Sequence, residues 1–590
     1  MTSPPELPFD DSRRLTGYNR YFAAAGAVLE TLQVPASDAL VDAWKARVTR
    51  MRAALGWPDA AIEVRRHCGQ ASLAFAAPPD QLLAATEVNE WAWLAAVHAA
   101  GIDAGRFHAP GHPAAWDEAS ALETLRRLAA AERSPPLVGL VDAAERRGLN
   151  VLIDDDTLSI GSGQGSRHWP LAQLPDAARV DWSAVHDVPV ALVTGSNGKT
   201  TTTRLLAAMS RAHGWRTAHT CTDGVHVGEA ALAEGDYSGP AGARLALREP
   251  GIEAAILETA RGGILRRGLA VQHAQVAVVT NLSDDHFGEY GVHDLDGLAE
   301  AKLTVARALG KQGVLVLNAD DPLLVASAAR LAVPIAWFAL DADAPGLLAH
   351  RAHGGRTCGV RRGRLVLGIA GVEHELGAVE AMPLTFGGSA RYNIANAAAA
   401  ALAAQALGIR PDEIRMVLAG FGSGRADNPG RLQFWNPCGI RVFLDYAHNP
   451  DGLAGLLAVA SRDRRGRLGL LLGQAGNRGD ADIRELARVA ASFQPDRIVL
   501  KDMGGMLRGR ASGEVPAILR EELGRRGLGQ ERVLERLDEV EAARSLLEWA
   551  RPGDTVVLPV HGKQGRPAIT RLLAAMGSSG PPVADSSPAS

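Results

Sequence analysis

Residues 194–203 read Thr-Gly-Ser-Asn-Gly-Lys-Thr-Thr-Thr-Thr and directly follow the apolar run Val188–Val193. This order predicts a buried strand that turns through a glycine-rich loop into a helix. Glycines let the backbone wrap around a phosphate chain, and the first turn of the helix directs its N–H groups at the phosphates. The sequence therefore predicts an α/β domain built around a phosphate-binding loop.

Two side chains of this loop carry most of its chemistry. Lys199 can reach the terminal phosphates of a nucleotide as a point charge, and the Thr200 hydroxyl can ligate Mg²⁺. The other loop positions that we expect at the nucleotide are Gly195, Asn197, Gly198 and Thr201. The alternative is a turn that binds nothing, and the strand, the lysine and the threonine together disfavour it.

Strands and helices alternate from Val188 onward, which is typical of a parallel sheet flanked by helices. The first alternating unit contains short apolar runs that predict strands buried on both faces: Ala254–Leu257, Val276–Thr280 and Val314–Leu317. Gly, Asp, Asn and Pro then cluster at Phe421–Arg431 and indicate a boundary. A second alternating unit follows, with strands expected at Val442–Leu444, Leu468–Leu472 and Arg497–Leu500.

At 590 residues the chain is too long for a single core, so we predict an α/β multidomain protein. Its predicted segments are an α+β N-terminal domain (1–165), a linker (166–187) that follows the Gly161–Gly165 junction, a P-loop α/β domain (188–424), a Rossmann-like α/β domain (425–575) and a disordered tail (576–590). In the N-terminal domain we expect helices at Ala36–Leu55, Glu87–Ala100 and Asp117–Ala131, and strands at Ala61–Arg66 and Ser72–Ala77. Trp91 and Trp93 are expected in its core.

Charge and composition exclude several classes of protein. The net charge of −4, with scattered Lys and Arg, indicates no nucleic-acid-binding face. The four cysteines lie far apart without a CxxC pair, which argues against a disulfide framework or a zinc site. The sequence contains no apolar run of about 18 residues and no secretory signal at its start, so we expect no membrane contact and a cytoplasmic protein.

A carboxylate follows the strand predicted after the loop. Glu258 stands directly after Ala254–Leu257, at the strand end where ligands of open α/β sheets gather. Beside a triphosphate such a carboxylate is a candidate Mg²⁺ ligand. A structural salt bridge to Arg261 or Arg266 is the alternative.

The next predicted strand leads into Thr280-Asn-Leu-Ser-Asp-Asp-His286. His286 is a candidate second metal ligand or phosphate contact, although a histidine after a strand is more often an ordinary polar residue. Asn281 in the same segment is expected at the nucleotide. Lys302 follows on a predicted helix, and the residues alone leave two readings open: a surface charge, or a lysine carbamylated by CO₂ that serves as an anionic ligand.

Several motifs resemble those of the Mur ligase family. Val193 replaces the first glycine of the common GxxxxGK[ST] loop, and the resulting compact TGxNGKT loop is similar to the ATP loop of these ligases. The stretch from Val188 to Pro559 resembles the Mur-ligase half of cyanophycin synthetases in particular. The segments that carry this resemblance are Cys221–Val225, Gly235–Pro240, Glu258–Leu269 (ETARGGILRRGL), Leu317–Asp321, Asp445–Pro450 and Leu507–Glu514. Leu15–Arg20 (LTGYNR) is more weakly similar to the N-terminal domain of those enzymes.

The resemblance implies a set of roles at matching positions. Lys199 and Thr200 would hold the phosphates of ATP and a Mg²⁺ ion, with Glu258 and His286 completing a metal shell of two Mg²⁺ ions. Lys302 lies where Mur ligases carry the carbamylated lysine. The family pattern also places four residues around the nucleotide, two in an NxxNA element and two in a mobile C-terminal domain that closes over ATP: Asn393, Asn396, Arg431 and Asp445. A plain Pro-Gly turn before Arg431 and a helix cap at Asp445 are the alternatives.

The chain also departs from cyanophycin synthetases. These enzymes carry an ATP-grasp domain that extends the polyaspartate backbone, whereas only about 25 residues separate Gly161 from Val188 here. The gap is too short for such a domain.

The resemblance implies an ATP-dependent amide ligase that forms an acyl phosphate. This ligase would join a basic amino acid, with arginine favoured, to an aspartate-containing small or peptide acceptor. We expect the amine to be read around Asn477–Asp482 and Asp502–Glu514, where carboxylates could pair with a guanidinium or could equally be solvated.

Three other readings remain open. The chain could be a non-catalytic partner of a full-length cyanophycin synthetase, or a Mur-type ligase with an unrelated small acidic acceptor. It could also be a nucleotide-dependent switch or transport ATPase, which the loop type disfavours. A homo-oligomer, or association with a cyanophycin synthetase, is compatible with the sequence.

Overall fold

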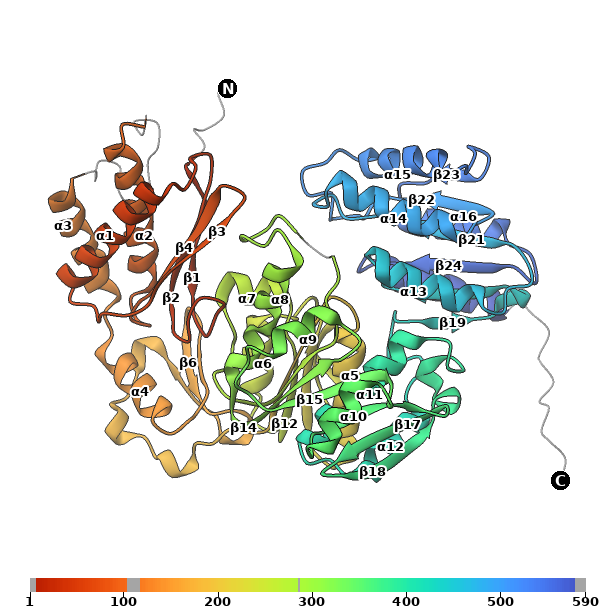
Figure 1. Ribbon diagram of the computed structural model, residues 1–590, viewed down its shortest axis with the longest axis horizontal. Coiled ribbons are helices and arrows are strands. Elements are labelled where there is room, and N and C mark those ends of the chain that lie inside the picture. The colour runs from red at the N-terminus through yellow and green to blue at the C-terminus, as the bar shows by residue number, and fades with distance from the viewer. Residues whose placement is uncertain (1–6, 103–116, 285–286, 579–590) are drawn as a thin grey trace. The chain divides into compact units, whose positions relative to one another are not determined.

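The computed structural model describes residues 7–102, 117–284 and 287–578 (Figure 1). The chain divides into two compact units. Unit 1 comprises residues 1–376 and 395–417, and unit 2 comprises residues 377–394 and 418–590. The N-terminal module and the phosphate-binding loop therefore belong to one unit. Residues 377–394 and 418–424 belong to unit 2, whereas the sequence assigned them to the predicted P-loop domain 188–424.

The N-terminal module of unit 1 is an antiparallel sheet of order β1-β2-β4-β3 with three helices. Its elements are β1 (Phe9–Leu15), β2 (Gly26–Thr31), α1 (Asp38–Ala54), β3 (Ile62–His67), β4 (Gln70–Ala76), α2 (Leu82–Ala99) and α3 (Glu118–Glu132). Helix α2 packs on β1 and β2, and α1 and α3 pack on α2 (Figure 1). Trp91 and Trp93 of α2 are buried, which confirms that both belong to the core. Helix α2 begins five residues earlier than predicted, because Leu82, Ala84 and Ala85 continue its buried face.

Residues 166–187, predicted as a linker, are structured. These residues form β7 (Arg167–Pro170) and the 3₁₀ turns η2 (Leu171–Gln173), η3 (Ala177–Arg179) and η4 (Trp182–Ala184). Strand β7 completes a small antiparallel sheet of order β5-β6-β7. The elements that precede it are α4 (Pro135–Glu145), β5 (Val151–Ile153), β6 (Thr157–Ile160) and the 3₁₀ turn η1 (Gly163–Gly165). Gly163 has φ +57°, and a Cβ there would lie 2.4 Å from the Ile252 carbonyl oxygen. The glycines at 161–165 therefore permit tight packing instead of forming a flexible hinge.

The large sheet of unit 1 has the order β11-β10-β9-β12-β8-β13-β14-β15-β16-β17-β18 within the described residues. The ladders from β9 through β12, β8, β13, β14 and β15 to β16 are parallel, as the alternating pattern predicts. Its strands are β8 (Val190–Thr194), β9 (Thr217–Cys221), β10 (Gly224–Val227), β11 (Ala230–Glu234), β12 (Ala254–Glu258), β13 (Ala274–Val279), β14 (Leu309–Asn318), β15 (Ile335–Asp341), β16 (Thr357–Arg361), β17 (Arg364–Ile369) and β18 (Val372–Ala378).

Helices and short turns connect these strands. They are α5 (Lys199–Ala212), α6 (Pro240–Leu247), α7 (Arg261–Arg267), α8 (Leu295–Leu303), η5 (Thr304–Ala308), α9 (Pro322–Ala328) and α10 (Pro345–Ala352). After η6 (Val379–Ala381) and η7 (Pro383–Thr385), the chain forms α11 (Arg391–Ala406) and α12 (Pro411–Gly420), each of which spans a boundary between the units.

Unit 2 is built on a sheet of order β19-β20-β24-β21-β22-β23, parallel except for the β19–β20 pair. Its elements are β19 (Gln433–Trp435), η8 (Pro437–Gly439), β20 (Arg441–Asp445), α13 (Pro450–Ser461), β21 (Leu468–Leu472), α14 (Asp480–Ser492), β22 (Arg497–Leu500), α15 (Glu514–Arg525), β23 (Val533–Glu535), α16 (Glu539–Trp549), β24 (Thr555–Pro559) and α17 (Gly565–Ser578). One apolar core joins the sheet to α13–α15, and a second joins it to α16 and α17. This confirms an α/β C-terminal region with helices on both faces.

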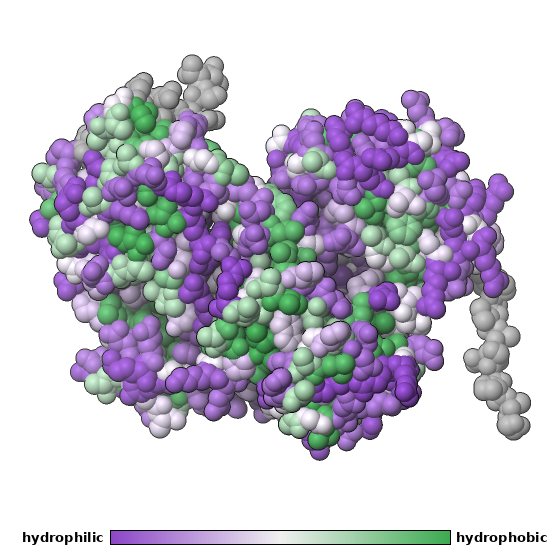
Figure 2. Space-filling model, in the orientation of Figure 1, coloured by the Kyte–Doolittle hydropathy of each residue, from purple (hydrophilic) through white to green (hydrophobic). Residues whose placement is uncertain are grey.

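No helix within the described residues is long and apolar enough to cross a membrane. On the face drawn in Figure 2, hydrophobic residues are intermixed with hydrophilic ones.

Candidate functional site

The predicted loop connects β8 to α5, and two glycines give it its shape. Gly195 has φ +142° and Gly198 has φ +84°, backbone angles that residues other than glycine rarely adopt. A Cβ at Gly195 would lie 1.9 Å from Thr280 Oγ1, and one at Gly198 would lie 2.1 Å from Asn396 Oδ1. The loop is therefore wedged between the end of β13 and helix α11, and only glycine fits at either position.

Asn281 holds the loop in place from the neighbouring strand end. Its side-chain oxygen accepts the Asn197 N–H at 2.8 Å, and its amide donates to the Asn197 carbonyl at 3.1 Å. The Thr280 hydroxyl donates to the same carbonyl at 2.5 Å, and the Asn281 carbonyl accepts the Ser196 N–H at 3.0 Å. Asn281, predicted at the nucleotide, thus shapes the loop backbone, and Thr280 is a contributor that sequence reasoning missed.

Two lysines far apart in the sequence converge on one backbone oxygen of the loop. Lys199 Nζ donates to the Gly195 and Ser196 carbonyls at 3.0 Å each, and Lys302 Nζ donates to the Gly195 carbonyl at 2.8 Å. Lys302 is only 2% exposed, so it is not a surface charge. Two neighbouring ammonium groups in a partly water-excluded site create a positive potential that favours an anionic ligand.

Thr200 and Glu258 form the oxygen-rich part of the site. Glu258 ends β12, which runs parallel to β8, and it is 2% exposed. The Thr200 hydroxyl donates to Glu258 Oε2 at 2.8 Å and lies 3.3 Å from the Thr222 hydroxyl. A hydroxyl and a carboxylate are the ligands that Mg²⁺ prefers, so this pair fits the magnesium ion that the sequence implies. Thr201, the next residue of α5, is also buried.

The two arginines that could form a salt bridge with Glu258 both contact residues of the segment after β13. Arg261 donates to Glu289 at 2.7 Å, and Arg266 donates to the Tyr290 hydroxyl at 2.7 Å. His286, predicted as a metal ligand, lies outside the described residues.

The two asparagines of the NxxNA element belong to different units. Asn396, in unit 1, is 4% exposed, and its side-chain oxygen covers Gly198 as described above. Asn393, in unit 2, is 1% exposed and donates its amide hydrogen to the Leu384 carbonyl at 2.9 Å.

Arg431 and Asp445 lie close together within unit 2. The Arg431 guanidinium lies 4.3 Å from the centre of the Tyr446 ring, and Asp445 accepts the Leu432 N–H at 2.6 Å. Burial raises the pKa of Asp445, and the positive charge of Arg431 opposes that rise. The N-cap of α13 is Asn449, so Asp445 does not cap the helix.

The region expected to read the amine already contains an arginine of the chain itself. Arg510 donates to Asp480 and to Glu514, at 2.7 Å each. Asp502 accepts the Ser512 hydroxyl at 2.6 Å and the Gly513 N–H at 3.1 Å, and so fixes the loop before α15. These carboxylates are therefore engaged within unit 2.

The segments Leu15–Arg20 and Glu258–Leu269 meet in space. The Thr16 N–H donates to the Arg267 carbonyl at 2.8 Å, and the Leu269 N–H donates to the Tyr18 carbonyl at 2.7 Å. Because a Cβ at Gly17 would lie 2.1 Å from the Leu269 carbonyl oxygen, this approach requires glycine. The N-terminal module is thus fastened to the helix that follows the Glu258 strand.

Arginines of the N-terminal module also reach the segment that leads to Lys302. Arg20 donates to Glu300 at 3.1 Å, and Arg65 forms an ion pair with the same carboxylate. The Arg13 guanidinium lies 4.6 Å from the centre of the Tyr290 ring. Sequence reasoning assigned no role to these arginines, because their neighbours are hundreds of residues away along the chain.

Sequence profiles of two domains match the chain. The Mur ligase middle domain matches residues 193–404, and the glutamate ligase domain of Mur ligases matches residues 430–559.

Curated relatives share this part of the chain. The cyanophycin synthetase of Geminocystis herdmanii is 38% identical over 335 residues, which cover 56% of this chain and 38% of that protein. The UDP-N-acetylmuramoyl-L-alanyl-D-glutamate–2,6-diaminopimelate ligase of Alkalilimnicola ehrlichii is 31% identical over 376 residues, or 61% of this chain and 68% of that protein. The chain thus spans about two fifths of the length of the cyanophycin synthetase that it matches. The solved structure of E. coli FolC in complex with ADP aligns with a TM-score of 0.47 and 20% identity, over 66% of this chain and 90% of that one.

Proposed function

Because the chain belongs to the Mur ligase family, we propose that it is an ATP-dependent ligase that joins an amino acid to a carboxylate through an amide bond. The observation that carries this proposal is the meeting of Lys199, Lys302 and the Thr200–Glu258 pair around one loop. That arrangement places positive charge for phosphates, and oxygen ligands for a magnesium ion, beside the N-terminus of helix α5.

The proposed chemistry begins with ATP as a substrate. A carboxylate is a poor electrophile, so phosphoryl transfer from ATP to the acceptor carboxylate produces an acyl phosphate and releases ADP. The loop backbone and Lys199 would hold the phosphates in line, and Thr200 and Glu258 would hold the magnesium ion. A bound Mg²⁺ neutralises charge that develops on the transferred group. Attack by the amine of the second substrate then forms the amide and releases phosphate.

We further propose that Lys302 works as a carbamate. Its side chain is almost fully buried and shares the Gly195 carbonyl with Lys199, so in its ordinary form it adds a second positive charge to an enclosed site. After the ammonium loses a proton, the neutral amine would form an N–C bond with CO₂ and release a second proton. The resulting carbamate anion would remove the repulsion between the two lysines. The new oxygens could then serve as ligands for a second magnesium ion.

The proposed acceptor is acidic and contains aspartate. Arg20 and Arg65 extend from the N-terminal module to Glu300, which lies two residues before Lys302. The Arg20 side chain is 5% exposed, and its Nε and Nη1 atoms have no hydrogen-bond partner within the described residues. Buried guanidinium hydrogens that lack an acceptor favour the binding of carboxylate groups.

The proposed amine is a basic amino acid, with arginine favoured over lysine. The support is the similarity to cyanophycin synthetases across the segments Gly235–Pro240, Glu258–Leu269 and Leu507–Glu514. A planar guanidinium forms paired hydrogen bonds with carboxylates that an ammonium cannot reproduce.

The test is ADP release from ATP with a matrix of substrates. The donors are arginine, lysine, ornithine, glutamate and diaminopimelate, the acceptors are free aspartate, β-aspartyl-arginine and polyaspartate, and mass spectrometry identifies the products. We expect turnover only when an acidic acceptor and a basic amine are both present. Turnover with ATP alone would indicate an ATPase, and a complete lack of turnover would favour a non-catalytic partner of a cyanophycin synthetase. Preference for an acidic or neutral amine would contradict the donor assignment but not the ligase assignment.

Lys199→Ala tests whether the ligase activity depends on the phosphate-binding loop. Removal of one group that stabilises transition-state charge lowers the rate by about 10²–10³-fold, and we expect a loss of at least this size. Lys311→Ala is the matched control, because Lys311 is an exposed lysine on β14. Unchanged ligation in Lys199→Ala would contradict the proposed site.

A further inference from the structure

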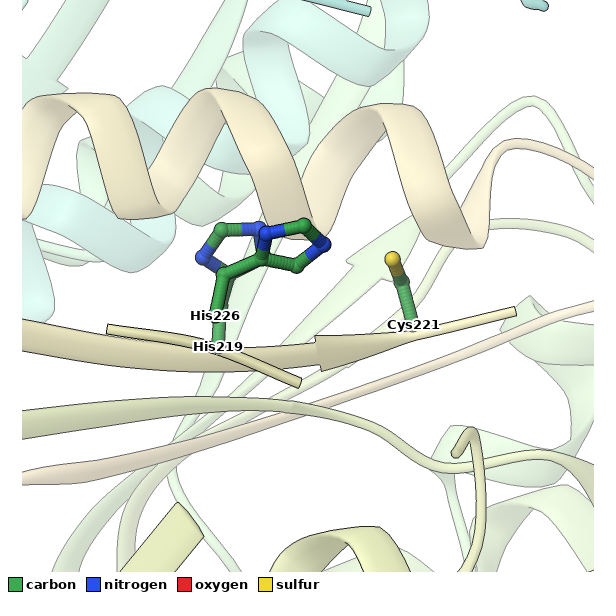
Figure 3. A group of neighbouring side chains, drawn as sticks. All are labelled: His219, Cys221 and His226. Atoms are coloured by element: carbon green, nitrogen blue, oxygen red, sulfur yellow. The ribbon is translucent and has the colours of Figure 1, made fainter. Parts of the chain in front are cut away.

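The β9–β10 hairpin of unit 1 presents two histidines and a cysteine on one face of the sheet (Figure 3). His219 and Cys221 are two residues apart on β9, so their side chains point to the same face. His226 on β10 is the direct antiparallel partner of His219. Their ligand atoms lie within 4.8 Å of one another, and Figure 3 shows all three side chains rising from the strands toward a helix.

The two imidazole rings leave polar atoms buried without a partner. The rings are stacked, with centroids 4.8 Å apart and planes 10° apart. His219 is 7% exposed and Cys221 is fully buried. Within the described part of the chain, neither His219 Nδ1 nor His226 Nε2 has a hydrogen-bond partner. A native fold rarely retains two such atoms side by side unless a ligand satisfies them.

One arginine and one aspartate lie beside the cluster. Arg204 of α5 places its Nη2 atom 3.8 Å from Cys221 Sγ and 2.9 Å from Asp223 Oδ2. Burial raises the pKa of the Cys221 thiol, and the charge of Arg204 opposes that rise. A metal ion that binds there would displace the thiol proton and leave the thiolate as its ligand. Burial, reinforced by the charges of His226 and Arg204, lowers the pKa of His219 well below its usual range. Its ring is therefore neutral near pH 7 and can donate a lone pair.

We propose that His219, Cys221 and His226 form a binding site for one thiophilic d-block cation, with Zn²⁺ as the natural occupant. Two imidazole nitrogens and one thiolate are ligands for zinc and not for Mg²⁺ or Ca²⁺, which select oxygen. Ligand atoms around a tetrahedral zinc ion stand about 3.3–3.8 Å apart, which small side-chain rotations achieve from the observed separation. Water would complete the coordination, since His226 is only partly buried.

This site is distinct from the magnesium site proposed above, and it does not depend on the ligase activity. The two differ in chemistry, although Thr222, which follows Cys221, lies against the Thr200 hydroxyl. Cysteine spacing argued against a zinc site in this chain. That argument considered only cysteine pairs, whereas this ligand set is assembled by the register of a hairpin.

Cobalt titration of the full-length protein tests the proposal, because Co²⁺ reports its ligands by absorption. We expect one equivalent of Co²⁺ to bind with tetrahedral d–d bands and a sulfur-to-cobalt charge-transfer band, and one equivalent of Zn²⁺ to displace it. Cys221→Ser should abolish the charge-transfer band. Cys438→Ser is the matched control and should retain it, because Cys438 is an exposed free thiol in unit 2.

His226→Gln removes the ligand on β10, the second strand of the site. His226 is half-buried, so the fold can accommodate this change. Loss of an outer partner of a metal ligand costs about 10–100-fold in affinity, so loss of a ligand itself should weaken Co²⁺ binding by at least about 100-fold. Circular dichroism establishes that each variant is folded. The proposal is overturned if the folded wild-type protein shows no charge-transfer band, if Cys221→Ser retains that band, or if His226→Gln binds Co²⁺ as tightly as the wild type.

Discussion

The contact between Gly17 and Leu269 makes a sharp quantitative prediction about how the N-terminal module is fastened. In Gly17→Ala the new Cβ would lie 2.1 Å from the Leu269 carbonyl oxygen, whereas real Cβ contacts stay beyond 3.0 Å. The two backbones must therefore separate by at least about 0.9 Å. This movement strains the two flanking hydrogen bonds, from Thr16 to Arg267 and from Leu269 to Tyr18. At about 0.5–1.5 kcal/mol for each bond, the local cost is about 1–3 kcal/mol.

Hydrogen–deuterium exchange measured by mass spectrometry reports that cost locally, without requiring two-state unfolding of a large chain. A loss of about 1–3 kcal/mol in local opening free energy corresponds to exchange that is about 5- to 150-fold faster. We expect this acceleration in peptides that cover residues 12–22 and 265–272, with little change in unit 2.

Gly262→Ala is the matched control, because it makes the same chemical change in the same Glu258–Leu269 segment. A Cβ at Gly262 meets no atom within 4 Å, and the residue lies in helix α7, where alanine is favoured over glycine by up to about 1 kcal/mol. The two substitutions should therefore have opposite signs. If Gly17→Ala exchanges at the wild-type rate in both peptides, or if the two variants behave alike, the argument from close backbone packing is wrong.

Three further predictions concern the lysine, the missing domain and a buried carboxylate. Lys302→Ala should lose ligase activity and regain part of it with formate or acetate, whereas an unmodified ammonium in an active crystal would argue against carbamylation. The purified protein should not lengthen a polyaspartate main chain with aspartate and ATP, because residues 161–188 leave no room for an ATP-grasp domain. Added main-chain aspartates in the mass spectrum would refute this prediction. Burial alone would raise the pKa of Glu30, but hydrogen bonds from His67, Ser72 and Arg13 and the charge of Arg13 lower it from 4.5 to about 2. The ionised Glu30 contributes about 3 kcal/mol to stability above pH 4.5, and this contribution is lost as the pH falls toward 2. In urea unfolding, Glu30→Gln should therefore destabilise β1–β4 at pH 7 and much less at acidic pH. An equal effect at both pH values would contradict the assignment.

Local sequence determined the elements that carry the nucleotide chemistry. The apolar run, the two glycines and the following Lys-Thr specify a strand, a loop and a helix within fifteen residues, and β8 and α5 confirm them. The strands Leu468–Leu472 and Arg497–Leu500 agree with the prediction residue for residue. Glu258 could be placed at the loop because the carboxyl ends of parallel strands share one edge of a sheet. Backbone propensity and side-chain periodicity act over a few residues, so they can be read directly from the chain.

Only the tertiary structure decided which distant groups meet. Nothing in the sequence near Lys302 indicates that its ammonium reaches the Gly195 carbonyl, or that Gly17 fits against Leu269. The pairing of His219 with His226 depends on the register of one hairpin, and a shift of one residue would turn His226 to the opposite face. Such contacts arise when whole elements pack, and packing sums many weak, non-directional apolar contacts spread over the chain. No short pattern encodes that sum, which is why the sequence predicts the parts of this site while the fold alone brings them together.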